Sequence, residues 1–516
     1  MSVFNHYFLR LQNGNDVRGV AIATDDEPKT LSPGIAAFIC RAFVTFLEKE
    51  SGKSASDLRI GIGHDSRISA GDILAGCKRG LSVSQVFDCG LISTPAMFQS
   101  TVLPECHFDA AIMITASHLP FNRNGLKFFT KDGALSHDEL TDILNIAIQL
   151  AESFGDEDDL EIVSDKRLQI GQIYSKPFDL VSLYCEHMKN LIKTAVQAED
   201  YDKPLKNMHI VEDAGNGAAG FFATRILEPL GADISGSQYL EPDGTFPNHV
   251  PNPENSVAMD AAKAMTLRAK ADLGVIFDCD GDRGAVVFDD GTEVNRNTLI
   301  ALLSAIVAEN HPDSTIVTDS VTSDELSLFL ENELHLTHLR FKRGYKNVID
   351  KGIALNQSGK NCELAIETSG HGAFKENHFS DDGAYIAMKI ICKMAQLRKD
   401  HKNIKDLIAN LKHPAESREF RYKINTDNFK EYGLKVLEDF KSFIKRDPRC
   451  HVVEPNYEGV RFSVSDERVI GWVLLRMSLH DPVMPMNIES KHSGGIDIIM
   501  QRLQPFFDRY KLLVLQ

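Results

Sequence analysis

The sequence predicts an α/β protein built from three successive α/β domains and a smaller α+β domain at its end. The chain has 516 residues, which is more than one hydrophobic core usually serves. Hydrophobic residues make up 43% and charged residues 25% of the chain, an ordinary globular composition. Short apolar runs alternate with helical segments of about ten to fifteen residues, and this pattern is typical of α/β layers.

Charge, cysteine content and hydropathy limit the partners and compartments of the protein. The formal net charge of -17 argues against a nucleic-acid-binding protein, because such surfaces need clustered Lys and Arg. The nine cysteines form no Cys-x-x-Cys pair, which favours reduced thiols. No segment resembles a signal peptide or a membrane span. We therefore expect no nucleic-acid or membrane partner and a cytoplasmic location, or the plastid stroma if a transit peptide has been removed.

Domain I is expected over residues 1–165. It begins with a glycine-containing segment that ends near Arg18, and this segment taken alone favours a hairpin turn that carries a solvated charge. An acidic stretch, 152–159, predicts an exposed connection at the end of the domain. Between these segments the pattern predicts helices at 33–50 and 70–81 and strands at 58–63, 86–89 and 110–114.

The loop after the apolar strand 110–114 is the expected centre of the chemistry. Ser117, with a histidine beside it, stands where ligands of open α/β sheets bind. Pro120 and Gly125 forbid a regular helix, and Lys127 adds a positive charge. This setting suits a phosphorylated serine, because a phosphate near pH 7 carries almost two negative charges. A simple turn is the alternative, whereas the missing Gly-x-Ser-x-Gly frame argues against a hydrolase.

Domain II, expected over residues 166–292, ends in a cluster of carboxylates. An apolar strand at 272–277 leads into Asp278, Asp280 and Asp282. Converging carboxylates repel one another and need a cation, and ligands that are all oxygen suit Mg²⁺. A polar turn with an Asp–Arg pair is the alternative. Before this cluster the pattern predicts a strand at 208–212, a structural glycine turn at 213–217 and helices at 218–230 and 256–269.

Domain III is expected over residues 293–411 and contains a candidate sugar-binding loop. Glu367, Ser369 and His371 offer a carboxylate, a hydroxyl and an imidazole on one glycine-containing loop. Sugar hydroxyls need donors and acceptors together, although a glutamate in a loop is often merely solvated. A basic turn that includes Tyr345 opens a helix at 347–355, and strands are predicted at 316–319 and 364–366.

Domain IV is expected over residues 412–516 and has the pattern of a small α+β domain. Arg476 and Ser478 lie two positions apart after a predicted strand, where a guanidinium and a hydroxyl can hold a phosphate. The pattern predicts a strand at 419–425, a helix at 429–444 and strands at 459–462 and 472–475.

Four loops in this order resemble those of the α-D-phosphohexomutase superfamily, the phosphoglucomutase and phosphomannomutase enzymes. They are the serine loop TASHLPFNRNGLK, the metal loop DCDGDR, the sugar loop ETSGHG and the phosphate loop RMSLHDP. Each loop alone is weak or moderate evidence, but the ordered set spans nearly the whole chain. Within the family, the chain is most similar to a divergent branch of plant and algal phosphoglucosamine-mutase-like proteins.

The resemblance implies three similar α/β domains and a TATA-binding-protein-like C-terminal domain around a central cleft. It implies a mutase that interconverts hexose 1-phosphate and hexose 6-phosphate, of glucose or mannose or both, through a phosphoserine and a hexose 1,6-bisphosphate intermediate. It further implies one Mg²⁺ per chain, hexose 1,6-bisphosphate as activator, a small sugar phosphate as the binding partner, and a monomer or homodimer.

Site residues follow from the same resemblance by their positions in the four motifs. The phosphoserine is Ser117, which also contacts the metal, and the remaining Mg²⁺ ligands are Asp278, Asp280 and Asp282. The catalytic centre also contains Arg18, Lys127, Arg283 and His371, with Lys127 and His371 as candidates for proton transfer. The substrate-binding residues are Tyr345, Glu367, Ser369, Arg476, Ser478 and His480.

Two departures from the family pattern leave other functions open. The phosphate loop carries His480 where relatives have a hydroxyl donor, and the lysine that many members carry after their third-domain strand is not evident at 319–322. The alternatives are a hexose-1,6-bisphosphate synthase, a phosphoglucosamine mutase and a non-catalytic sugar-phosphate sensor.

Overall fold

The computed structural model describes residues 3–153, 175–478 and 481–516. These residues form two compact units, which we call unit 1 and unit 2. Unit 1 comprises Met1–Leu299 and Ser369–Ile404, and unit 2 comprises Ile300–Thr368 and Lys405–Gln516. This division into two units is coarser than the four predicted domains, so the four domains stay a prediction. The first predicted boundary, near residue 165, lies outside the described residues.

The first sheet of unit 1 has the predicted apolar strand near its centre. Its order is β1-β2-β6-β5-β3-β4-β8, with β5, β3, β4 and β8 parallel and the other neighbours antiparallel. All five residues of β5 are buried, which confirms the predicted strand. The strands are β1 (Gln12–Asn13), β2 (Asp16–Val20), β3 (Arg59–His64), β4 (Gln85–Leu91), β5 (Ala110–Ile114), β6 (Arg123–Thr130), β7 (Gly133–Ala134), paired with β6, and β8 (Ser175–Pro177).

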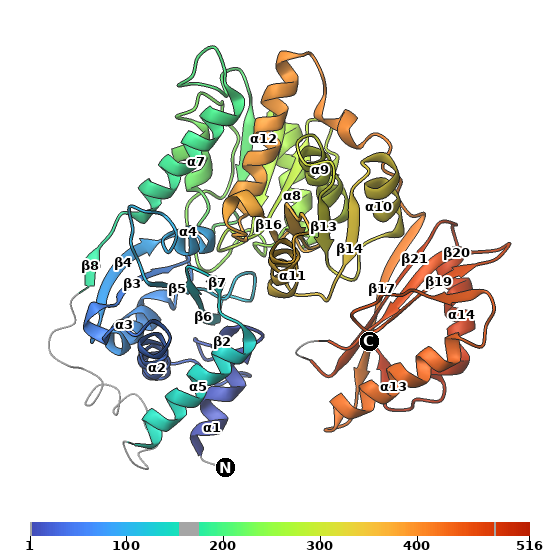
Figure 1. The fold of residues 1–516 in the computed structure, drawn as a ribbon, viewed down its shortest axis with the longest axis horizontal. Helices are drawn as coiled ribbons and strands as arrows, with labels where there is room; N and C mark the ends of the chain where they lie inside the picture. Colours follow the sequence, from blue (N-terminus) through green and yellow to red (C-terminus); the bar gives the residue numbers. More distant parts are fainter. Residues whose placement is uncertain (1–2, 154–174, 479–480) are drawn as a thin grey trace. The chain divides into compact units, whose positions relative to one another are not determined.

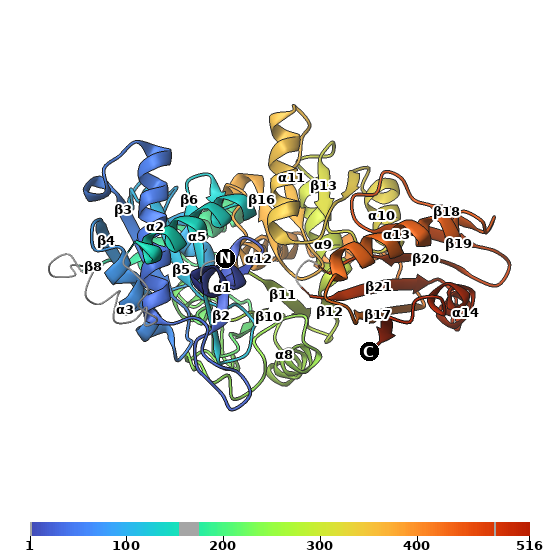
Figure 2. The ribbon, with the colours of Figure 1, turned by 90° about the horizontal axis from the view of Figure 1, so that it is seen from below.

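Three helices enclose the core of this sheet (Figures 1 and 2). Within this core, α2 (Pro33–Ser51) packs against α3 (Ala70–Gly80) and α5 (His137–Glu152). The Ser32 side chain caps α2, and Gly52 ends it with a φ of 70°, a left-handed conformation that glycine adopts readily. The shorter helices α1 (Val3–Phe8) and α4 (Thr94–Gln99) and the longer α7 (Leu180–Val196) complete this part of unit 1.

The second sheet of unit 1 has the order β12-β11-β10-β9. Its strands β9 (Ile210–Asp213) and β10 (Leu273–Phe277) are parallel, and β11 (Gly284–Phe288) and β12 (Glu293–Val294) continue it in antiparallel fashion. Two helices cover this sheet, α8 (Ser256–Ala269), which matches its prediction, and α12 (Gly383–Lys399), which also contacts α7.

The helix predicted at 218–230 forms only in part, as a π-helix at Phe222–Leu227. The Ala223 N–H, which an α-helix would pair with the carbonyl four residues earlier, donates instead to the buried Glu212 carboxylate at 2.6 Å. The Ala218 N–H donates to the Cys279 carbonyl at 2.7 Å. Tertiary partners therefore hold the start of this segment.

In unit 2, a short parallel sheet precedes the C-terminal domain. Strand β13 (Thr315–Thr318) pairs with β14 (Thr337–Arg340) on one side and β15 (Leu364–Ile366) on the other. The associated helices are α10 (Asp324–Leu328) and α11 (Tyr345–Gln357), and the chain passes from unit 1 into unit 2 within α9 (Arg296–Ala308).

The last sheet is fully antiparallel, with the order β18-β19-β20-β21-β17-β22. Helices α13 (Phe429–Ile444) and α14 (Gly495–Phe507) lie beside this sheet (Figure 2). They share one hydrophobic core with it, in which the ring centroids of Phe440 and Phe506 are 4.9 Å apart. The strands are β17 (Glu416–Ile424), β18 (Cys450–Val452), β19 (Val460–Ser465), β20 (Ile470–Leu475), β21 (Val483–Ser490) and β22 (Leu513–Leu515).

The opposite face of this sheet is tied to the third sheet by buried polar groups. The guanidinium of Arg461 lies 3.7 Å from the Trp472 ring centroid and donates to the carbonyls of Ser320 and Thr322. The Glu489 carboxylate accepts from Ser323 and from the Trp472 indole. Within unit 2 the two sheets are therefore joined by buried hydrogen bonds, and among the described residues only the Nε atom of Arg461 lacks a hydrogen-bond partner on that guanidinium.

Two further expectations concern thiols and membranes. All nine cysteines are free, and eight of them are buried. In the part of the chain that the structure describes, no helix is long and apolar enough to cross a lipid bilayer.

Candidate active site

Ser117 lies at the carboxyl end of β5, at the edge of the first sheet where the sequence predicts the site. Its φ is 50°, in the left-handed region, and its backbone N–H donates to the Thr115 hydroxyl at 2.8 Å. That hydroxyl in turn donates to the Asp65 carboxylate at 2.6 Å. A non-glycine residue adopts this backbone conformation only where its surroundings hold it, so the loop positions the serine hydroxyl.

Arg67 holds the backbone of the serine loop. Its fully buried guanidinium donates to the carbonyls of Ser117, Leu119, Pro120 and Arg123 and lies 3.2 Å from the Asp65 carboxylate. Five donors in a rigid fork suit this arrangement of acceptors. Sequence reasoning did not assign a role to Arg67, although the His64-Asp65-Ser66-Arg67 segment follows β3, whose end lies at the same sheet edge as the end of β5.

The three aspartates of the metal loop converge beside this serine. Asp278, Asp280 and Asp282 are buried, and their carboxylate oxygens lie within 4.8 Å of one another. The Ser117 hydroxyl donates to Asp278 at 2.8 Å, although the two residues are 161 positions apart in the sequence. Gly281 turns the loop with a φ of 73°. The structure thus brings together the predicted phosphoserine and all three predicted metal ligands.

The carboxylates fit a hard divalent cation. Burial and the neighbouring Asp282 and Asp280 raise the pKa of Asp278 well above its usual value, because three close negative charges disfavour ionisation. Among the described residues, neither Asp280 Oδ1 nor Asp282 Oδ1 has a hydrogen-bond partner, although both atoms are buried. Buried polar atoms are normally satisfied. An all-oxygen set with two unsatisfied oxygens matches the ligand preference of Mg²⁺.

Lys127 provides part of the opposing charge. It lies on β6, so the predicted loop ends at Arg123, earlier than expected. Its ammonium group contacts the Asp282 carboxylate and lies 3.4 Å from Asp280 Oδ2, with only 2% of the residue exposed. Burial alone would raise the pKa of Asp282, but the charges of Lys127, His371 and Arg283 outweigh it and lower that pKa.

Arg18 and Arg283 complete the cationic part of the site. Arg18 donates to the Thr115 carbonyl and to the Asp16 carboxylate, both at 2.8 Å, so it borders the serine loop. Arg283 is anchored by its backbone N–H, 3.2 Å from Asp278 Oδ1, and its side chain donates to His371 Nε2 at 2.9 Å. The hairpin that carries Arg18 is present as β1 and β2.

Two histidines face the serine and the aspartates. His118 Nδ1 is 3.2 Å from the Ser117 hydroxyl, and burial together with the charges of Arg283 and Arg18 lowers the pKa of His118 to about 2. His118 is therefore neutral. Burial also lowers the pKa of His371, but the carboxylates of Asp381 and Asp282 outweigh it and raise that pKa.

The predicted substrate-binding residues are divided between the two units. Ser369 and His371 belong to unit 1, whereas Glu367, Tyr345, Arg476 and Ser478 belong to unit 2. His480 lies outside the described residues. Tyr345 is the first residue of α11.

Within unit 2, short links connect the sugar loop to the phosphate loop. The Gly344 N–H donates to the Glu367 carboxylate at 2.6 Å, and the preceding N–H, of Arg343, donates to Glu458 at 3.1 Å. Glu458 is 3.8 Å from Arg476, which is 6% exposed. Glu367 and Arg476 are thus held by neighbouring segments. Sequence reasoning missed Arg343 and Glu458, because neither belongs to a motif with a known spacing.

Comparison with known proteins agrees with this geometry. Models of the phosphoglucomutase/phosphomannomutase family match residues 10–153 (alpha/beta/alpha domain I), 182–291 (domain II) and 295–413 (domain III). The chain belongs to the α-D-phosphohexomutase superfamily. Together the three matches cover the serine, metal and sugar loops.

Relatives of this superfamily align over nearly the whole chain. A phosphoglucomutase of Neisseria gonorrhoeae is 26% identical over 95% of both chains. A phosphomannomutase/phosphoglucomutase of Pseudomonas syringae is 28% identical over 94% of this chain and 92% of its own length. A crystal structure of a family protein from Burkholderia thailandensis has a TM-score of 0.77 at 24% identity, covering 98% of this chain and 99% of the other, and shows that the fold is shared.

Proposed function

We propose that this phosphohexomutase interconverts the 1-phosphate and the 6-phosphate of glucose, of mannose or of both, using Ser117 as the group that carries the phosphoryl moiety. The observation that supports this most is the hydrogen bond of 2.8 Å from the Ser117 hydroxyl to Asp278, inside a buried cluster of three aspartates and Lys127. A serine that only stabilised a turn would not need this set of opposed charges.

Each side chain then has a role in the exchange. Phosphorylated Ser117 donates its phosphoryl group to the free hydroxyl of a hexose monophosphate, and the resulting hexose 1,6-bisphosphate returns its other phosphoryl group to the serine. Arg18 and Arg283 stabilise the negative charge of the transferring group. Lys127 and His371 are the candidates for moving the hydroxyl proton. Positioning of the two reacting oxygens supplies much of the rate, as in other phosphoryl transfers.

Mg²⁺, one ion per chain, would be held by Asp278, Asp280 and Asp282 together with an oxygen at Ser117. When bound, such an ion neutralises charge on the phosphoryl oxygens. This set contains no thiolate or imidazole, which fits a hard cation better than zinc.

Recognition of the sugar phosphate is proposed for the polar loops. Glu367 and Ser369 would bind sugar hydroxyls, while Arg476, Ser478 and His480 would bind the phosphate that does not react. Tyr345 is proposed as a further substrate-binding residue. A buried arginine beside hydroxyls is a suitable phosphate site. The same loops must accept the substrate in both orientations, because the bisphosphate turns between the two transfers. Hexose 1,6-bisphosphate would act as activator because it regenerates the phosphoserine.

A coupled assay tests this function. The protein is supplied with Mg²⁺, a trace of hexose 1,6-bisphosphate and, in turn, the 1-phosphates of glucose, mannose, glucosamine and N-acetylglucosamine. We expect 6-phosphate to form from at least one of the first two and Ser117→Ala to reduce the rate by about a thousandfold or more. Ser93→Ala is a matched control, because Ser93 is buried in unit 1 and its hydroxyl lacks a hydrogen-bond partner among the described residues.

Other outcomes would change the assignment. An alanine variant at position 117 that turned over at the parent's rate would show that another residue carries the phosphoryl group. Conversion of glucosamine 1-phosphate alone would make the chain a phosphoglucosamine mutase. Accumulation of hexose 1,6-bisphosphate from a second phosphorylated metabolite would instead indicate a bisphosphate synthase, and binding without turnover would indicate a sensor.

A further inference from the structure

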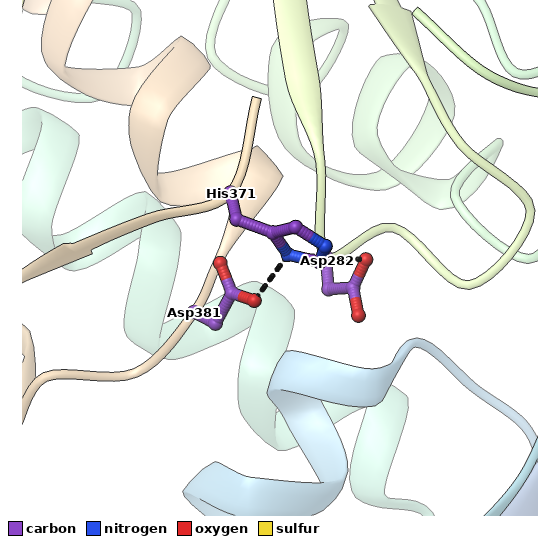
Figure 3. A group of neighbouring side chains, drawn as sticks. All are labelled: Asp282, His371 and Asp381. Carbon is purple, nitrogen blue, oxygen red and sulfur yellow. Dashed lines mark hydrogen bonds and ion pairs between the residues drawn. The ribbon is translucent and has the colours of Figure 1, made fainter. Parts of the chain in front are cut away.

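Asp381 lies directly behind His371 in unit 1, on the loop that precedes α12 (Figure 3). One oxygen of its carboxylate, Oδ2, contacts His371 Nδ1, and the other, Oδ1, accepts the Gly372 N–H at 2.9 Å. On the far side of the ring, Nε2 is 2.9 Å from Arg283 Nε. The imidazole is thus held at both nitrogens, and 6% of His371 is exposed.

The two contacts determine which nitrogen of His371 carries the proton. A guanidinium N–H can only donate, so the contact with Arg283 needs a lone pair on Nε2. The Asp381 carboxylate can only accept, so the contact with Nδ1 needs a proton there. Both are satisfied by a neutral ring with its proton on Nδ1. The carboxylate therefore selects the tautomer whose lone pair lies on Nε2, where it accepts the Arg283 N–H in this structure.

The residue that follows Asp381 is anchored by buried partners. Asp382 accepts from the Tyr184 hydroxyl at 2.8 Å and from the Tyr385 N–H at 2.9 Å, which caps α12. Asn377 links Asp382 to Gln99, with distances of 3.2 Å and 2.8 Å. This network fixes the backbone beside Asp381, whose own carboxylate is held by the Gly372 N–H at 2.9 Å.

We propose that Asp381 is a positioning residue, which acts through His371 by fixing its tautomer and its orientation beside Arg283 and Asp282. This inference rests on the proposed function. It assigns a role to a residue outside the four motifs. In transfer from Ser117 to the sugar, the Arg283 N–H must first leave Nε2, and the sugar O–H proton then goes to that lone pair. The phosphorus bond to the serine oxygen breaks as the bond to the sugar oxygen forms. The serine oxygen takes up one proton and Nε2 releases the one it received, so protons balance and no co-reactant is needed.

Asp381→Asn removes this role with a minimal change in shape. Both carboxylate oxygens accept hydrogen bonds, from His371 and from the Gly372 N–H, whereas an asparagine has one oxygen and one donor nitrogen. The variant must therefore mismatch one of these contacts. We expect kcat to fall by about 100-fold, the size of a typical proton-transfer contribution, while KM stays within about threefold.

A double-mutant cycle separates positioning from a general structural role. If Asp381 acts only through His371, then Asp381→Asn costs less than about threefold in a chain that already carries His371→Ala. Asp213→Asn is the matched control, because Asp213 pairs with His249 at 3.1 Å in another buried carboxylate–imidazole pair of unit 1. We expect the Asp213 substitution to lower the melting temperature and to change activity equally with and without His371. An equal loss from Asp381→Asn in both backgrounds would overturn the inference.

Two measurements do not depend on turnover. Nitrogen spectra of protein with isotope-labelled histidine, assigned with His371→Ala and recorded with Mg²⁺ at alkaline pH, should show Nδ1 protonated and Nε2 unprotonated, and Asp381→Asn should change this distribution. The opposite tautomer in the parent would overturn the inference. Metal analysis should find equal Mg²⁺ in the parent and in Asp381→Asn. Loss of metal would place Asp381 among the metal ligands instead and would also overturn it.

The outcomes for the two proposals are distinguishable. A parent protein that converts no sugar phosphate contradicts the proposed function, and the nitrogen spectra then still decide the tautomer. An active parent with additive effects of Asp381→Asn and His371→Ala contradicts only the role of Asp381.

Discussion

Arg67→Lys should loosen the serine loop and slow catalysis, although the charge is retained. The arginine donates to four carbonyls through two nitrogens, whereas a lysine has a single nitrogen at the end of its side chain. The contact with the Ser117 carbonyl is buried and the other three are part-buried, and we expect at least two of the four carbonyls to lose the arginine. At about 1–3 kcal/mol for each carbonyl left without this partner, the local cost is about 2–6 kcal/mol.

Hydrogen exchange measured by mass spectrometry reads this cost directly. Because about 1.4 kcal/mol corresponds to a factor of ten, amides of residues 115–125 should lose protection by about 30-fold or more. The value of kcat should fall at least tenfold. Arg59→Lys is the matched control, since Arg59 donates to the carbonyls of His107 and Cys106 from the start of β3. Unchanged protection of the serine loop in Arg67→Lys would refute the reasoning.

Two further predictions concern buried charge. Lys127→Met should lower kcat by about 100-fold or more. It should also strengthen Mg²⁺ binding, because Lys127 competes with a cation for Asp280 and Asp282. Calorimetric titration measures the Mg²⁺ affinity, and an unchanged or weaker affinity would contradict the prediction. Burial and the charge of Glu367 raise the pKa of Asp319 to about 7 in the folded chain, whereas its value in the unfolded chain is about 3.9. Between these two pH values the folded chain retains a proton that the unfolded chain has lost. The free energy of unfolding therefore falls as the pH rises. Asp319→Asn lacks this penalty, and its melting temperature relative to the parent should rise from about pH 4.5 to about pH 7.5; a constant difference would show that Asp319 does not titrate in this window.

Much of the fold was predictable because local patterns and tertiary packing agree. The strand Ala110–Ile114 and the helices Ser256–Ala269 and Phe429–Ile444 match their predictions, since an uninterrupted apolar run or a capped, periodic segment leaves few alternatives. The helix predicted at 218–230 forms only as the π-helix Phe222–Leu227, because the Glu212 carboxylate, distant in sequence, takes the Ala223 N–H. Such partners cannot be read from the segment itself.

The candidate site was predictable where chemistry follows the end of a strand. Ser117 follows β5 and Asp278 follows β10, and the resemblance predicts that both residues bind one metal ion; the structure adds the contact between the hydroxyl and the carboxylate. Arg67 and Asp381 were missed, because their roles depend on carbonyls and an imidazole that only the tertiary structure brings near. Arg461 was missed for the same reason: it alternates with core residues on β19 but lies on the other face of the sheet.

The most direct test of the central claim is a single-turnover transfer experiment. The protein is charged with a radiolabelled phosphoryl group from glucose 1,6-bisphosphate, freed from ligand, and mixed with unlabelled hexose 1-phosphate. We expect the label on the peptide that contains Ser117 and its transfer to the sugar within one turnover when Mg²⁺ is present. A chelator should stop the transfer without removing the label. Label on another residue, or a labelled Ser117 that no hexose phosphate discharges, would contradict the account.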